Sequence, residues 1–321
     1  MSIDVQHEAE PWQPHLQTLH RQFYEHANDR CLLWVNAAQG DPFADDPLVD
    51  ERRVRVPIQH ANFDLVFAPY LVPLDLGRSG DADVFKRSVA IGWSAWELDS
   101  LQAFNGQAIG GWIAGDQPAP ALAPLLAQHW AANCHLHYVN GLTKLLRFHD
   151  PSVREWLWRT LTPQQQARLL GPARCIVAFN RQQALMMHGV IAAAPEVHEG
   201  PGKLQLTPAQ WEQVDDYAVV HAAWLRWRSN VQDTSHGLAS LDGWEQALFH
   251  ALRAASVYGI TDRQDRELFA VHALQMGTDF HEHARMLAVW EKTRTGDYYG
   301  AACEEVSGQP AYALQDYLHG N

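Results

Sequence analysis

Short apolar runs of strand length recur in the first part of the chain, separated by polar and proline-rich stretches. The run CLLWVNAA at residues 31–38 is typical of a strand that is buried on both faces of a sheet. Similar runs predict strands at residues 68–76, 88–96 and 174–180. Apolar positions at helical spacing predict a helix within residues 11–28.

A hairpin followed by a helix is the most informative local pattern. The stretch HLHYV is followed by Asn140-Gly141 and then by LTKLLRF, and Asn-Gly favours the tight turn between two antiparallel strands. Asp150 and Pro151 come next, and they suit the N-cap and the first position of a helix. A capping box predicts that a second helix starts at Thr162.

The pattern changes after residues 192–202, which are rich in Ala, Pro and Gly and indicate a linker. Beyond the linker only helical spacing is found. Capping boxes open helices at Thr207 and Thr261, and apolar spacing predicts others over residues 241–258 and 280–293. We therefore expect an α/β lobe with a mixed sheet and a hairpin, residues 1–190, and an all-α lobe, residues 203–321.

Composition narrows the possible partners and the location. The net charge of −13 disfavours contact with phosphate backbones, so we expect no nucleic acid partner. No apolar run approaches the roughly 18 residues that a membrane span needs. The first residues, MSIDVQHEAEPWQ, do not resemble a secretory signal, so we expect a cytoplasmic protein. The four cysteines are far apart and suit buried thiols.

The chain has 18 histidines, so metal sites need consideration. His135 and His137 stand two apart beside Cys134, but the hairpin places them in a sheet, and we interpret them as structural. His281 and His283 lack the i, i+4 spacing that places two imidazoles on one helix face. We expect no metal and no cofactor.

Two further groups of residues suggest catalysis only superficially. The stretch GWSAW at residues 92–96 lacks the glycine that a hydrolase nucleophile turn needs two residues after its serine. Arg147, His149 and Asp150 lie close together and could serve in acid–base chemistry. We favour a structural role in which Asp150 caps a helix and Arg147 pairs with a nearby carboxylate.

The tryptophans are the candidates for binding a partner. The chain has 13 of them, and tryptophan and arginine dominate protein interfaces. Trp224 and Trp227 lie on one side of a predicted helix, and Arg228 follows them. Either the two tryptophans belong to the core, or one of them, with Arg228, contacts a partner.

The chain resembles the type VI secretion effector-adaptor family, whose shared domain is known as a domain of unknown function. An ordered set of short motifs between Cys31 and Arg174 carries the resemblance: LWVNAA at 33–38, APYLV at 68–72, IGW at 91–93, Asn140-Gly141, RFHDP at 147–151 and LGP at 170–172. The motif residues that we single out are Asn140, Gly141, Arg147, Asp150 and Pro151. Asn36 and His149 depart from the family pattern.

The resemblance implies a cytoplasmic adaptor, or chaperone, that is not an enzyme. Such a protein binds a cognate effector, often by the N-terminal region of the effector, and promotes its loading onto the VgrG spike protein. The helical lobe would bind the effector, and the α/β lobe would be the shared scaffold. Two alternatives remain: an immunity protein that neutralises a toxin, and a metal-dependent hydrolase that uses His135, His137 or His149.

Overall fold

The computed structural model describes residues 10–25, 31–59, 63–103, 106–137, 143–189, 203–230 and 243–320. It divides the chain into two compact units, Met1–Trp211 and Glu212–Asn321. The boundary between the units lies inside helix α8 (Pro208–Asn230). The lobes that we expected, 1–190 and 203–321, stay a prediction about domains. Among the described residues, no helix is both long and apolar enough to cross a membrane.

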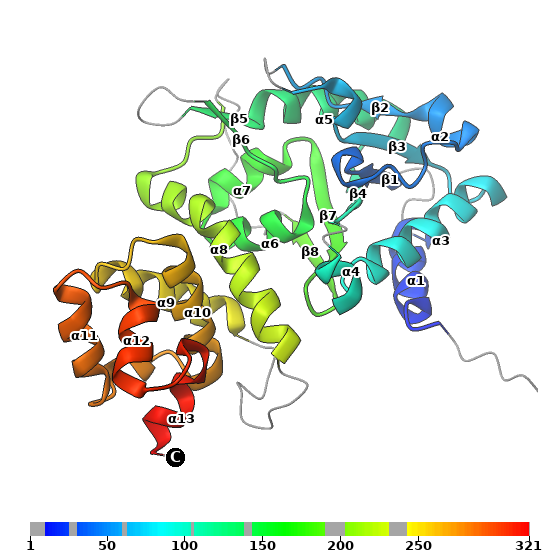
Figure 1. Ribbon diagram of the computed structural model, residues 1–321. Coiled ribbons are helices and arrows are strands. Elements are labelled where there is room, and N and C mark those ends of the chain that lie inside the picture. The colour runs from blue at the N-terminus through cyan, green and yellow to red at the C-terminus, as the bar shows by residue number, and fades with distance from the viewer. Residues whose placement is uncertain are drawn as a thin grey trace, which may run out of the picture. The chain divides into compact units, whose positions relative to one another are not determined.

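A six-stranded sheet forms the centre of the first unit (Figure 1). Its order is β2-β3-β1-β4-β7-β8, with the bounds β1 Cys31–Val35, β2 Val54–Arg55, β3 Tyr70–Leu74, β4 Ile109–Gly115, β7 Ala173–Phe179 and β8 Leu185–Gly189. Each described pair of neighbours is antiparallel. The α/β lobe is thus confirmed, but its sheet is antiparallel, not mixed. A continuous apolar run indicates that a strand is buried on both faces, but it does not indicate whether the strand runs parallel or antiparallel to its neighbours.

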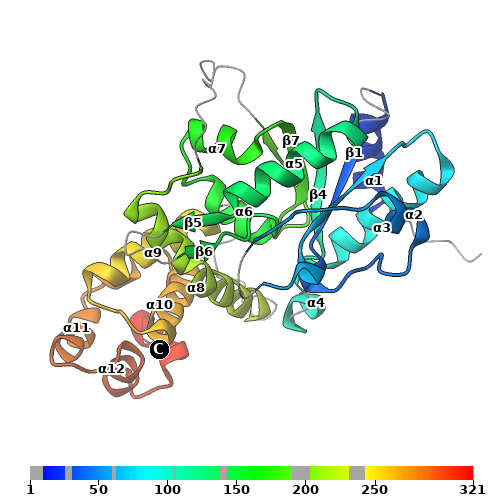
Figure 2. The same ribbon diagram turned by 90° about the horizontal axis from the view of Figure 1, so that it is seen from above.

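Helices cover both faces of this sheet (Figures 1 and 2). Helix α3 (Ser79–Ser94) contacts β3, β4 and β7, and helix α5 (Ala119–Asn133) contacts β1, β3 and β4. On the α3 face, the indole N–H of Trp112 donates to Ser88 Oγ at 2.9 Å. On the α5 face, Trp34 stacks on Trp130 with ring centroids 4.0 Å apart. This cover explains why every residue of β1 is buried.

The strand predicted at residues 88–96 is wrong, because these residues belong mostly to α3. The buried positions of the helix run with helical spacing: Asp81, Val84, Phe85, Ser88, Val89 and Gly92. This periodicity begins upstream of the apolar run. A window limited to residues 88–96 therefore shows an apolar segment and hides its period.

The central strand β4 was not predicted, because glycines interrupt the apolar pattern of residues 106–115. A Cβ at Gly110 would lie 2.8 Å from the carbonyl oxygen of His149 and 3.1 Å from Trp34 Cγ. Gly111 has φ of +134°, and a Cβ there would lie 2.5 Å from the carbonyl oxygen of Val177. The glycines allow neighbouring backbone to approach β4 closely, which is a known use of glycine inside strands.

The predicted hairpin and helix starts of the first unit are largely confirmed. Strands β5 (His135–His137) and β6 (Thr143–Leu145) pair antiparallel, while the Asn140-Gly141 turn lies outside the described residues. The capping box at Thr162 is present. The remaining elements are α1 Gln13–His20, η1 Arg21–Glu25, η2 Ala37–Gln39, α2 Pro47–Arg52, η3 Leu65–Phe67, α4 Leu98–Gln102, α6 Pro151–Trp158 and α7 Pro163–Leu170.

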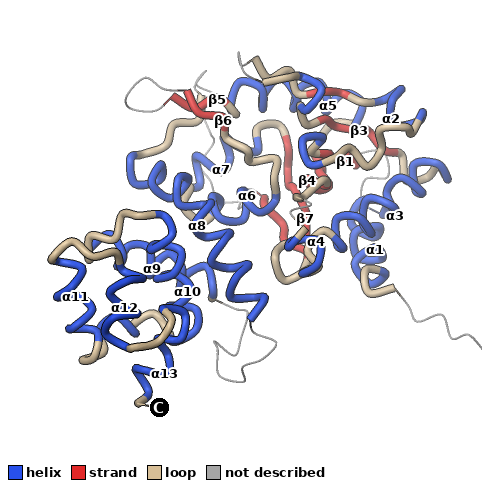
Figure 3. Tube along the Cα trace, viewed as in Figure 1, coloured by secondary structure: helices blue, strands red, loops and turns tan. Residues whose placement is uncertain are grey.

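Every helix or strand described in the second unit is a helix (Figure 3), which confirms the predicted all-α lobe. After α8 come α9 Trp244–Val257, α10 Arg263–Met276, η4 Phe280–Glu282, α11 Met286–Arg294, α12 Tyr299–Ser307, η5 Ala311–Ala313 and α13 Leu314–His319. The capping box at Thr207 is present. The cap of α10 is Asp262 rather than Thr261, because the Asp262 carboxylate accepts from the backbone N–H groups of Gln264 and Asp265.

The core of the second unit is rich in aromatic side chains. Phe269, Phe280, Trp290 and Tyr299 lie in one buried cluster. Within it, His272 is fully buried, and its two ring nitrogens contact the Tyr299 hydroxyl at 2.8 Å and a backbone carbonyl at 2.9 Å. Burial lowers the pKa of His272 to about 4. This histidine is therefore a neutral, hydrogen-bonded core residue at pH 7.

Candidate functional site

The motif Arg147–Pro151 forms the corner between β6 and α6. One Asp150 carboxylate oxygen accepts hydrogen bonds from the Ser152 backbone N–H at 2.9 Å and from its hydroxyl at 2.6 Å. The other oxygen lies 3.2 Å from Arg147 Nη2. Pro151 occupies the first turn of α6. The helix cap and the Arg147 ion pair that we expected are both present.

Arg154, one turn further along α6, is a buried cation that sequence reasoning missed. Its side chain is fully buried. The guanidinium donates to the carbonyl oxygens of Phe148 at 3.0 Å and Gly110 at 2.7 Å, and it lies 5.4 Å from the centre of the Trp34 ring. Burial lowers the pKa of Arg154 to about 10, so it stays charged at neutral pH. A sequence signal existed: Arg154 stands three residues before the apolar Leu157, on the same face of α6.

A buried charge pair involves the next residue of α6. Glu155 Oε2 lies 3.4 Å from Arg181 Nε, and the two side chains are 3% and 0% exposed. The Arg181 guanidinium also lies 5.7 Å from the Trp96 ring centre. A buried pair of this kind adds little net stability, but removal of one partner leaves the other charge buried without a counter-ion. Two adjacent residues of α6 thus attach this helix to the sheet: Arg154 contacts Gly110 on β4, and Glu155 pairs with Arg181 just after β7.

His149 is buried at the same corner, only 4% exposed, with its ring 6.4 Å from that of Trp34. Burial lowers its pKa to about 4. His188 on β8 is also buried, and desolvation followed by the charge of Arg154 lowers its pKa to about 3. Both imidazoles are neutral at pH 7. The burial of His149 does not favour its use by a hydrolase, because a substrate has little access to it.

The other histidine candidates give no metal centre in the described part of the chain. His135 and His137 lie on β5, but their side chains are outside the described residues. His281 lies in η4, and its ring contacts those of Tyr258 and Phe269. Across the described ranges, no three His, Cys, Asp or Glu side chains are grouped so that they could hold a metal ion. The described cysteines carry free thiols.

The tryptophans of α8 lie in the interior. Trp224 and Trp227 are 1% and 2% exposed, and Trp224 lies 6.1 Å from the Trp244 ring on α9. Arg228 is half-buried. Of the two roles that the sequence left open, the structure shows that of a core residue for both indoles. Partner binding by Trp224, Trp227 and Arg228 stays a prediction.

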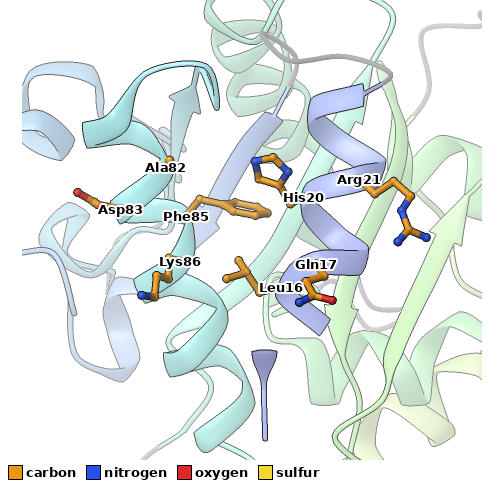
Figure 4. Close-up of a pocket in the computed structure, with 8 residues that line it drawn as sticks. All are labelled: Leu16, Gln17, His20, Arg21, Ala82, Asp83, Phe85 and Lys86. Carbon is orange, nitrogen blue, oxygen red and sulfur yellow. The ribbon is translucent and has the colours of Figure 1, made fainter. Parts of the chain in front are cut away.

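A groove of about 490 Å³ lies between α1 and α3 (Figure 4). Leu16 of α1 and Phe85 of α3 point toward each other across it, whereas Arg21 and Asp83 point away. Phe85 is buried and forms part of an apolar floor. The lining therefore suits an apolar side chain, and its polar groups do not converge on a common point.

The comparisons with known proteins give one match. Residues 65–168 match the model of a family described as "Domain of unknown function (DUF4123)". No curated protein and no solved structure matches the chain. The matched stretch lies within the region over which the motifs run, Cys31 to Arg174. It includes α3, β4, α5 and the Arg147–Pro151 corner with Arg154, and it ends inside α7.

Proposed function

We propose that this protein is a cytoplasmic adaptor that binds a type VI secretion effector and promotes its loading onto the VgrG spike. One observation carries the proposal. The DUF4123 match covers residues 65–168, and this domain is known as that of the effector-adaptor family that the ordered motifs resemble.

We further propose that the protein acts by binding and not by catalysis. The polar residues of the motif corner support this view, because their side chains are engaged in holding the fold. Asp150 caps α6, Arg147 pairs with Asp150, and His149 is buried against Trp34. Their positions suit a rigid scaffold on which binding surfaces are displayed.

In this proposal the helical unit contacts the effector. Its core contains several large aromatic side chains packed together, which suits a stable platform for a protein partner. An adaptor of this kind would shield an apolar effector segment before secretion, and it would raise the local concentration of the effector at the spike.

Purification of the full-length protein from its native host, followed by mass spectrometry of the proteins that co-elute, tests the proposal. We expect one effector and the spike protein in the same fractions. If the protein elutes alone, with stoichiometric metal that resists dialysis, the metal-dependent hydrolase would replace the adaptor.

A further inference from the structure

Three consecutive large apolar side chains are exposed on η3. Leu65, Val66 and Phe67 are 51%, 54% and 52% exposed. Other large apolar side chains exposed in the described part of the first unit stand singly along the chain: Tyr24, Leu125 and Met187. Single exposed apolar residues are ordinary, whereas contiguous ones mark interaction sites. We refer to these three residues as the η3 surface.

The η3 surface is held in a defined conformation. The Asp64 carboxylate accepts from the Val66 backbone N–H at 2.9 Å, and the Ala68 N–H donates to the Leu65 carbonyl at 3.1 Å. Arg55 Nη1 donates to the Val66 carbonyl at 3.0 Å and to the Ala68 carbonyl at 3.4 Å. These bonds fix the backbone while the side chains stay in solvent. A preorganised surface of this kind loses little conformational entropy when it binds.

Arg55 also gives the η3 surface a charge. The neighbouring arginines have carboxylate partners: Arg52 with Asp81, Arg53 with Asp50 and Asp41, and Arg87 with Asp46. Arg55 contacts backbone carbonyls and lies 5.7 Å from the Tyr70 ring centre, and none of its described contacts is a carboxylate. A cation with no carboxylate among its described contacts, beside an apolar surface, suits a partner that brings its own carboxylate.

We propose that the η3 surface docks an apolar segment of the spike protein that carries a carboxylate for Arg55. The inference rests on the proposed function and assigns a surface to one of its two partners. Leu65, Val66 and Phe67 open the stretch that matches the family model, residues 65–168. A surface within the shared domain fits the partner that adaptors have in common better than an effector that differs between them.

The experiment compares the full-length wild type with a Val66→Ser, Phe67→Ser variant. Binding of each to the purified VgrG trimer and to the effector that co-purifies with the wild type is measured by calorimetry. We expect the double variant to bind the VgrG trimer at least about tenfold more weakly, as truncation of interface hot spots does. Its affinity for the effector should equal that of the wild type. The matched control is Leu125→Ser, which removes a 44% exposed leucine from α5 and should change neither affinity.

Arg55 is tested separately through the dependence of binding on salt. Arg55→Gln keeps an amide donor near the η3 carbonyls but removes the charge. We expect slower association with the VgrG trimer and a weaker dependence of the association rate on ionic strength. Equal salt dependence in Arg55→Gln and wild type would contradict the ion pair that we propose.

Several outcomes would overturn the inference. These are unchanged spike affinity in the double variant, loss of effector binding instead, or a change only in the oligomeric state of the protein itself. If the double variant melts well below the wild type, Val66→Ser alone is used, since Val66 has the most exposed side chain of the three. If the wild type binds neither partner, the proposed function fails as well, so the two failures are distinguishable.

Discussion

At the scale of single residues, Arg154 is the clearest example of a charge used inside the fold. Its guanidinium joins the carbonyl of Gly110 on β4 to that of Phe148, and it lies over the ring of Trp34. One buried side chain thus contacts β4, β1 and the corner that precedes α6. Arg154 was predicted to lie inside a helix, but its burial was not inferred from its position on the same face of α6 as Leu157.

Replacing this arginine should destabilise the protein strongly. Arg154→Ala removes the guanidinium that donates to two buried carbonyls and opens a cavity beside Trp34, so we expect the free energy of unfolding to fall by about 3–5 kcal/mol. Chemical denaturation of the full chain measures the loss. Arg174→Ala is the control, because that side chain is 73% exposed and its loss should cost less than about 0.5 kcal/mol. Similar effects of the two substitutions would contradict this role of Arg154.

The buried histidines predict a dependence of stability on pH. His149, His188 and His272 have folded pKa values of about 4, about 3 and about 4, below the value near 6.5 of the unfolded chain. The unfolded state therefore binds more protons below pH 6.5. Each histidine should lower the free energy of unfolding by about 1.4 kcal/mol per pH unit from pH 6.5 down to its folded pKa. Above pH 6.5 these groups contribute no slope.

Denaturant titrations at pH 7.5, 6 and 5 test this slope, with His188→Met as the comparison. The variant removes one of the three titrating groups, so its free energy of unfolding should fall less steeply with decreasing pH than that of the wild type. A slope equal to that of the wild type would show that His188 is not a buried neutral imidazole.

At the scale of elements, the sequence predicted most of what local chemistry controls. Asp150 and Thr162 cap helices as expected, because a cap depends on a few adjacent residues. Features that depend on distant backbone were missed. The glycines of β4 resemble a loop in sequence, and only the approach of the His149 and Val177 carbonyls shows why glycine is needed there.

In the candidate site too, features set by adjacent residues were predicted, and features set by distant parts of the chain were missed. Arg147 and Asp150 were predicted to be structural from their spacing, and the structure pairs them. Arg154 and the exposed η3 residues were missed, because burial of a charge and exposure of an apolar run are both decided by tertiary packing. Residues 65–67 were not singled out for this reason.

Strand β4 gives a direct test at this scale. Gly110→Ala places a methyl group 2.8 Å from the His149 carbonyl oxygen, so strand and corner must move apart. We expect a loss of about 1–3 kcal/mol in the free energy of unfolding, as overpacking typically costs. Gly189→Ala on β8 is the control, because its nearest neighbour atom lies at 3.5 Å, an ordinary contact distance. The account of β4 fails if the two substitutions cost the same.

At the scale of the whole molecule, the chain combines two compact units. The first contains the stretch that matches DUF4123, with the η3 surface at its start, and the second is a helical unit with an aromatic core. In the proposed function the first unit docks on the spike, and the second holds the effector. This arrangement gives each partner its own surface, so that binding of one need not displace the other.

Effector secretion after deletion of this gene from its native host tests the central claim most directly. The effector in the culture medium and in the cells is followed by immunoblotting, and full-length protein is restored from a plasmid as the control. An adaptor predicts that the effector disappears from the medium, that other secreted spike components remain, and that the cells grow normally beside toxin-producing siblings. Unchanged secretion, with deletion cells killed by their siblings, would contradict the adaptor and identify an immunity protein instead.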